Sequence, residues 1–63
     1  MSNEAKAMMN MAMSIATINN IDIERMDLQR SHMKPDISFY TLTVWYSDGK
    51  EITIREDCTI VNR

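Results

Sequence analysis

Hydrophobic and polar positions follow two different periods along this chain. In the N-terminal third they recur every three or four residues, the spacing that gathers side chains on one side of an α-helix. The resulting stripe consists of Ala5, Met8, Ala12, Ile15 and Asn19. The pattern predicts a helix capped by Ser2 or Asn3. It ends at Asn19-Asn20, because Asn tolerates the left-handed conformation that terminates helices.

This helix has a wider apolar surface than one packing partner needs. Beside the stripe lie Met9, Met11, Met13, Ala16 and Ile18. An alternating methionine run can hold Cu(I) through soft thioether ligands. On a helix, however, Met9, Met11 and Met13 point in different directions and cannot converge on one ion. We therefore interpret the three methionines as an adaptable packing or binding flank.

The period changes at residue 21. Ile21 and Ile23 alternate with acids, whereas Met26 and Leu28 alternate with polar residues one position out of phase. A strand with a bulge near Glu24-Arg25 would bring both alternations onto one face. A continued helix is the alternative over residues 21–30, because part of the same set can share a helical face. The pattern favours the strand, followed by a loop over residues 31–36.

The clearest pattern in the last third is that of a β-hairpin. Residues 37–46 are dense in β-branched and aromatic side chains, and residues 51–55 alternate. Between them, Asp48-Gly49 predicts a two-residue type I′ turn, which would pair Trp45 with Ile52.

This register determines which side chains share a face of the hairpin. One predicted face carries Ile37, Phe39, Trp45, Ile52 and Ile54. The other carries Tyr40, Leu42, Val44 and Tyr46, opposite Thr53 and Arg55. Residues 57–61 form either a short further strand or a docking tail.

Together these elements predict an α+β fold. One N-terminal helix packs on a small antiparallel sheet of two to three strands, in the order α-β-β-β. Neither repeats nor a linker divides the chain, so residues 1–63 are expected to form a single domain.

One helix covers only one face of such a sheet, and we expect it on the Phe39 and Trp45 side. The second face would then expose large side chains, which monomers rarely leave uncovered. The sequence therefore predicts a homo-oligomer, with a dimer as the first expectation. The candidate association surfaces are the sheet face of Tyr40, Leu42, Val44 and Tyr46 and the helix flank of Met9, Met11 and Met13.

Size and cysteine content agree with this expectation. A chain of 63 residues lies near the lower limit for folding without a disulfide, a metal or a partner subunit. Cys58 is the only cysteine, so no intramolecular disulfide can form. A free thiol suits a reducing cytoplasm, where we place the protein.

Charge and hydropathy argue against two classes of partner. The formal net charge is −2, and the basic residues are interleaved with acids, whereas nucleic-acid binding needs clustered Lys and Arg. The most apolar stretch, residues 7–18, is too short to span a bilayer and is interrupted by polar residues. We therefore expect no nucleic-acid and no membrane partner.

No residue set indicates catalysis, a cofactor or a metal. His32 has Ser31 and Asp36 nearby in the chain, but adjacency alone does not provide the geometry of a catalytic triad. Asp57 precedes Cys58, and a neighbouring carboxylate raises a thiol pKa and opposes its activation. We expect a buried or half-buried structural cysteine and a protein that is not an enzyme.

The function most compatible with these features is stoichiometric binding of an unidentified protein partner. Size and the lack of a reaction centre suggest an inhibitor from a phage or mobile element, directed at a host defence system. One alternative is an oligomer that sequesters a small anionic ligand such as a nucleotide. Its candidate anchors are Arg25, Arg30, Lys34 and Arg55. A structural module of a larger assembly is the other alternative.

Overall fold

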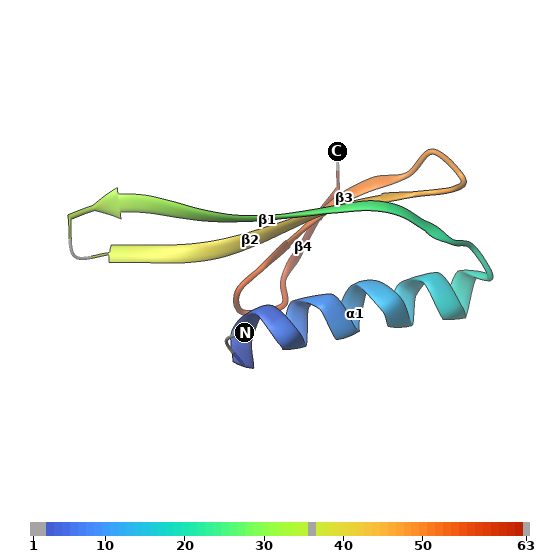
Figure 1. The fold of residues 1–63 in the computed structure, drawn as a ribbon, viewed down its shortest axis with the longest axis horizontal. Coiled ribbons are helices and arrows are strands. Elements are labelled where there is room, and N and C mark those ends of the chain that lie inside the picture. The colour runs from blue at the N-terminus through green and yellow to red at the C-terminus, as the bar shows by residue number, and fades with distance from the viewer. Residues whose placement is uncertain (1–2, 36, 63) are drawn as a thin grey trace.

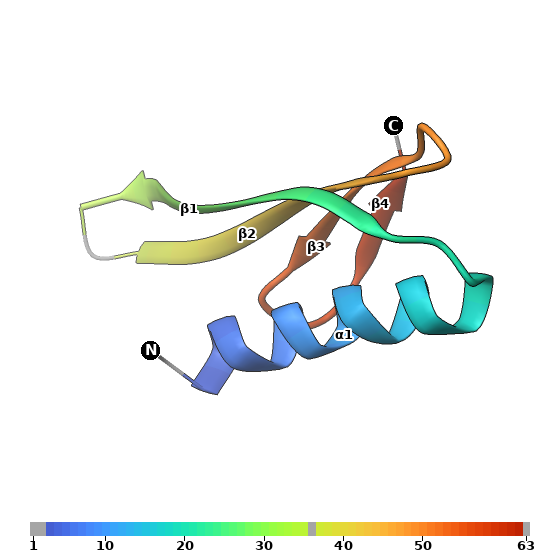
Figure 2. The same cartoon turned by 45° about the vertical axis from the view of Figure 1, so that its right-hand side comes forward.

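One helix packs against one face of a four-stranded antiparallel sheet (Figure 1; Figure 2). The computed structural model describes the backbone of residues 3–35 and 37–62, and the side chains of that range except those of residues 33, 34, 37 and 62. The elements are α1 (Asn3–Asn19), β1 (Ile23–Lys34), β2 (Ile37–Tyr46), β3 (Glu51–Arg55) and β4 (Ile60–Asn62). The strands lie in sequence order. The predicted α+β fold is confirmed, with four strands instead of two to three.

Helix α1 ends where the paired asparagines predict. Asn20 takes a left-handed conformation with φ of 55°. The Ile21 amide donates to the Ala16 carbonyl at 3.0 Å, and the Asn20 amide donates to the Thr17 carbonyl at 3.2 Å. This pair of bonds is a Schellman motif, which satisfies carbonyls that the last turn would otherwise leave unpaired. Ile21 packs against the core, and this contact directs the chain toward β1.

Strand β1 confirms the strand interpretation of residues 21–30, and its bulge lies where the phase change predicts it. Ile23 pairs with Tyr46 and Arg25 pairs with Trp45, so Glu24 is the extra residue. The loop predicted for residues 31–36 is wrong over most of its length, because β1 continues to Lys34. Pairing with the first half of β2 extends the strand, and the β1–β2 ribbon projects past the N-terminal end of α1 (Figure 1).

The turn between β2 and β3 differs from the predicted two-residue type I′ turn. A type I′ turn requires positive φ at both central residues. Gly49 meets this requirement, with φ of 91°, but Asp48 does not. The Gly49 amide donates to the Tyr46 carbonyl at 3.0 Å, and the Tyr46 amide donates to the Lys50 carbonyl at 2.9 Å. The connection is therefore a three-residue loop with a glycine bulge. Asp48 stabilises it by accepting from the Lys50 amide at 2.9 Å.

The extra loop residue shifts the β2–β3 register by one position and reverses the predicted faces of β3. Val44 pairs with Ile52, and Trp45 pairs with Glu51. Because paired residues point to the same side of a sheet, Ile52 and Ile54 join the Val44 side instead of the Trp45 side.

Helix α1 therefore covers the face that we expected to be free. Leu42, Val44 and Tyr46 are at most 1% exposed, and Tyr40 is half-buried against the same core. Leu42, Val44 and Tyr46 lie under α1, so the part of the predicted association surface that they form is not exposed, whereas Tyr40 is half-buried. Self-association itself stays a prediction. The core consists of Met8, Ala12, Ala16, Leu42, Val44, Tyr46, Ile52 and Ile54.

One hydrogen bond inside this core connects the helix to the sheet. The buried Tyr46 hydroxyl donates to the Ala12 carbonyl at 2.9 Å. A second connection lies at the end of the sheet, where the Ser47 amide donates to the Asp22 carbonyl at 2.8 Å. The Ser47 hydroxyl accepts from the Asp22 amide at 2.9 Å. These bonds tie the chain after α1 to the β2–β3 loop.

The β3–β4 connection repeats the geometry of the β2–β3 loop. The Cys58 amide donates to the Arg55 carbonyl at 2.8 Å, and the Arg55 amide donates to the Thr59 carbonyl at 2.8 Å. Asp57 accepts from the Thr59 amide at 3.0 Å, as Asp48 does in the first loop. Cys58 occupies the position equivalent to Gly49, with φ of 68°. A side chain at this φ is strained, so the second loop carries a conformational cost that the first avoids.

We expect Cys58→Gly to stabilise the protein and Gly49→Ala to destabilise it. Relief of the left-handed strain, offset by the greater freedom of unfolded glycine, should raise the free energy of unfolding by about 0.5–1 kcal/mol. Gly49→Ala should lower it by about 1–2 kcal/mol. Urea unfolding at constant m-value measures both changes, and Cys58→Ser controls for loss of the thiol. A Cys58→Gly variant no more stable than Cys58→Ser would contradict the strain assignment.

The buried Tyr46 hydroxyl should make stability fall in alkali. Burial raises the pKa of Tyr46, so above about pH 10 the unfolded chain releases this proton more readily than the folded chain. Tyr46→Phe should cost about 1 kcal/mol at neutral pH, and its disadvantage should shrink as pH rises above about 10. Urea unfolding across pH measures the difference, with Tyr40→Phe as control. A disadvantage that stays constant across this range would refute it.

Candidate functional site

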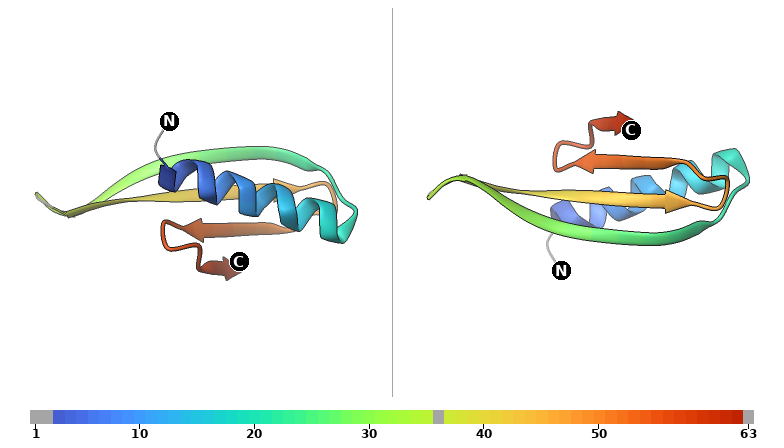
Figure 3. Two further views of the ribbon diagram at one scale, coloured as in Figure 1. Left: turned by 90° about the horizontal axis from the view of Figure 1, so that it is seen from below. Right: turned by 90° about the horizontal axis from the view of Figure 1, so that it is seen from above.

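The sheet face opposite α1 is left uncovered within residues 3–35 and 37–62. Figure 3 shows α1 in front of the sheet in one view and behind it in the other. We call this surface the open face. From the strand pairing it consists of Arg25, Asp27, Gln29, Ser31, Phe39, Thr41, Thr43, Trp45, Glu51, Thr53, Arg55 and Val61.

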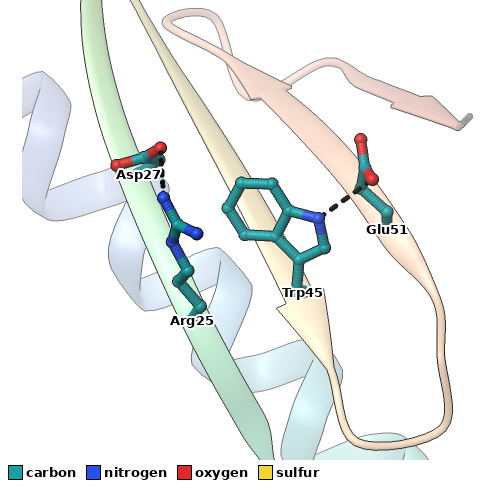
Figure 4. Close-up of polar contacts among 4 residues, drawn as sticks. All are labelled: Arg25, Asp27, Trp45 and Glu51. Atoms are coloured by element: carbon teal, nitrogen blue, oxygen red, sulfur yellow. Dashed lines mark hydrogen bonds and ion pairs between the residues drawn. The ribbon is translucent and has the colours of Figure 1, made fainter.

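On the open face, the Trp45 side chain is held in place by contacts from both neighbouring strands (Figure 4). Its indole Nε1 donates to Glu51 Oε1 at 2.9 Å, from the neighbouring strand β3. The Arg25 guanidinium, from β1 on the other side, lies 4.9 Å from the ring centroid. Arg25 also pairs with Asp27 at 3.3 Å. The indole is thus held from both neighbouring strands while it remains half-buried.

This arrangement has the composition of a binding anchor. Tryptophan and arginine are enriched among the interface residues that contribute most to affinity. A ring that is already held by its neighbours loses little side-chain entropy when a partner covers it. The Arg25 and Asp27 side chains are 68% and 44% exposed, so both can also reach a partner.

Three threonines separate Trp45 from the other end of the open face. Thr41, Thr43 and Thr53 are half-buried and lie side by side on β2 and β3. The Thr53 Oγ1 atom is buried and has no hydrogen-bond partner among the described residues. A ligand or partner group that reached it would satisfy a hydroxyl that the chain leaves unpaired.

From Thr41 and Thr53 toward the end of the sheet, the open face is hollowed into a shallow depression of about 640 Å³. Its lining consists of Phe39, Thr41, Thr53, Arg55, Glu56, Asp57 and Val61. The hydrogen bond from the Thr59 side chain holds the pKa of Asp57 below its usual value, with the Thr59 amide and the Arg55 charge adding to this effect. Arg55 therefore lies beside an ionised carboxylate, which weakens it as an anchor for an anionic ligand.

The structure separates three of the four predicted anion anchors. Arg25 is engaged with Asp27 and the indole. Arg30 lies 5.7 Å from the Tyr40 ring centroid and donates to the Ser38 hydroxyl, on the α1 side of the ribbon. Arg55 lies in the depression. The Lys34 side chain lies outside the described residues, and the other three do not share a pocket in one chain.

The methionine flank is divided by its packing. Met9 and Met11 are half-buried against the core, whereas Met13 is 49% exposed. Of the seven predicted association residues, only Met13 thus presents a largely free side chain. The Met9, Met11 and Met13 side chains do not form one continuous exposed surface.

The remaining candidates for chemistry lie apart. His32 was expected in a loop, but it lies on β1 opposite Ser38, where its side chain is exposed. Cys58 is free and half-buried, as expected. Within the described residues, no three His, Cys, Asp or Glu side chains come close enough to hold a metal ion.

Sequence reasoning missed the open face because the predicted register placed Trp45 in the core. A signal was available. With a three-residue loop, Leu42, Val44, Ile52 and Ile54 all fall on one face of the hairpin, and the threonines fall on the other. The two-residue loop mixes apolar and polar side chains on both faces, which is the poorer amphipathic pattern.

The fluorescence of Trp45, the single tryptophan, should respond to the loss of its contacts with Glu51 and with Arg25. Glu51→Ala removes the Nε1 acceptor and should shift the emission maximum of Trp45 to longer wavelength as water replaces the carboxylate. Arg25→Ala uncovers the ring and should increase its quenching by acrylamide, at a stability cost of about 0.5–1 kcal/mol. Lys6→Ala, at an exposed position of α1, is the matched control. Unchanged emission and quenching in both variants would show that these contacts do not hold the ring in solution.

Comparison with known proteins provides no functional information, so a proposal for the function has to rest on the geometry of the open face. No family model matches the chain, no curated protein matches it, and no solved structure matches it. No helix in the described part of the chain is long and apolar enough to cross a membrane.

Proposed function

We propose that this chain is a small non-enzymatic protein that binds a macromolecular partner stoichiometrically through its open face. The observation that carries the proposal is the half-buried Trp45, held between Arg25 and Glu51 on a sheet face that α1 leaves uncovered. A rigid aromatic anchor surrounded by charged groups is the usual composition of a protein-binding surface.

The chemistry of the open face favours a protein partner over a nucleic acid. Arg25 and Arg55 alternate with Asp27 and Glu51 around the threonines, so neither sign of charge dominates. A nucleic acid would require a basic surface. A protein partner would bury Trp45 in an apolar pocket and offer groups of both charges at its rim. Inhibition by steric occupation would follow from such binding; a phage or mobile-element origin stays a prediction.

Two open-face variants and one control test the proposal. Thr43→Lys places a long charged side chain at the centre of the open face without removing a core residue. Trp45→Ala removes the anchor. Thr17→Lys is the control, because Thr17 is exposed on α1. Quantitative mass spectrometry then compares the proteins that each purified variant captures from a lysate of the source cells.

We expect a partner that wild type and Thr17→Lys retain and that both open-face variants lose. For the purified partner, Trp45→Ala should weaken binding by about thirtyfold or more, which corresponds to about 2 kcal/mol. Circular dichroism establishes that each variant is folded. Capture that Thr43→Lys and Trp45→Ala leave unchanged would exclude the open face, and the absence of any reproducible partner would count against a binding protein.

A further inference from the structure

Strand β1 is a long edge of the sheet. It contains 12 residues and pairs only with β2, whereas the opposite edge, β4, contains three. Figure 3 shows β1 as the outermost strand of the sheet over the part that lies beside α1. Within the part of the chain that the structure describes, no strand pairs with its outer side. A long edge of this kind is a template for adding another strand.

The hydrogen-bonding direction of β1 follows from that of β2. The Tyr46 amide donates to Lys50, on the β3 side. Successive residues of an antiparallel strand direct their peptide groups to opposite neighbours, so the peptide groups of Trp45 and Thr43 point toward β1. Their partners are Arg25 and Asp27, whose peptide groups therefore point toward β2.

The peptide groups of the residues between these point outward. Met26 and Leu28 lie next to Asp27 on either side and therefore direct their N–H and C=O groups away from β2. They form the part of the outer edge that is ready to accept a strand.

Apolar side chains gather along this edge on the α1 side of the sheet. Met26 and Leu28 pair with Val44 and Leu42, which places them on that side. Yet they remain 38% and 39% exposed, whereas their partners are buried. Met13, which is 49% exposed, lies on the β1 side of α1, beside a shallow depression that reaches Ile23.

The charges on the other side of β1 are complementary to a second copy of the same strand. Arg25 and Asp27 lie two residues apart on the open face. When two copies pair antiparallel about a two-fold axis at Met26, each Arg25 stands opposite the other copy's Asp27. Opposite charges directly across a strand pair stabilise it, and the symmetry creates this contact twice. The two copies of Met26 then exchange both backbone hydrogen bonds at the axis.

We propose that the outer edge of β1 binds the β1 strand of a second copy of this chain. The sheet then continues across both copies as eight strands with a helix from each copy on one side. Met26 and Leu28 lie between the two helices, together with Met13. The two open faces become one surface. This inference does not require the proposed partner binding. The contact between the copies shares Arg25 and Asp27 with the open face, whereas Met26 and Leu28 lie on the α1 side of the sheet and are not part of the open face.

Charged substitutions at the edge test the interface. The double substitution Met26→Lys and Leu28→Lys adds positive charges to exposed positions, which is a common way to block edge pairing. Ile60→Lys is the matched control, since Ile60 is 41% exposed on β4, the other edge. Sedimentation equilibrium from low to high micromolar concentration measures the mass. We expect wild type and the control at about twice the 7.3 kDa chain mass and the double variant at one chain mass.

A charge exchange tests the register even if the double variant folds poorly. Arg25→Asp alone and Asp27→Arg alone each place like charges opposite one another in their own dimers. Mixed together, they place opposite charges across both contacts. We expect each single variant to dissociate at least tenfold more readily than wild type. Native mass spectrometry of the mixture should show mainly the mixed dimer.

Each result either supports or overturns the proposal. A wild-type monomer throughout the concentration series overturns it, and so does a dimer that the two lysines leave intact. A mixture with no preference for the mixed dimer overturns the pairing of Arg25 with Asp27. Loss of dimerisation by the double lysine variant, with unchanged capture of a partner, supports both proposals, because Met26 and Leu28 are not part of the open face. Failure of the proposed partner binding is therefore distinguishable from failure of the dimer.

Discussion

The register between β2 and β3 is the constraint on which the rest of the structure depends. It is set by the three-residue loop at residues 47–49, in which Gly49 adopts a conformation that other residues rarely accept. Because side chains in a strand alternate between faces, one residue more or fewer in this loop moves every side chain of β3 to the other face. The observed loop places Ile52 and Ile54 beside Leu42 and Val44, which gives α1 one continuous apolar surface.

Helix α1 then divides the sheet into a covered side and an uncovered side. On the covered side, small alanines allow α1 to approach the sheet, and Tyr46 spans the layers to bond the helix backbone. On the other side, the same alternation leaves threonines at the centre and Trp45 near one end. The folding of the core and the composition of the candidate binding surface are therefore two results of one register.

Residues in the left-handed conformation end helix α1 and the two loops that follow β2 and β3. Asn20 closes α1, Gly49 closes the β2–β3 loop and Cys58 closes the β3–β4 loop. In both loops an aspartate one position earlier accepts a backbone amide two residues ahead of it. Only the second loop has a residue that is poorly suited to the left-handed conformation. This contrast indicates that the hydrogen bonds of the loop suffice to hold Cys58 there against its local preference.

Local patterns were sufficient for the element types and for several boundaries. The spacing of Met8 and Ala12 specifies the helix, Asn20 specifies its end, and the phase change at Glu24 specifies the bulge. These features depend on neighbours within a few residues, so the sequence by itself determined them. The extension of β1 to Lys34 could not be predicted from local sequence, because residues 31–34 become a strand only through pairing with β2. The assignment of faces was decided by the tertiary structure, since Asp48-Gly49 is compatible with a loop of two or three residues. Packing under α1 favours the longer loop, and with it the placement of Trp45 instead of Tyr46 on the open face.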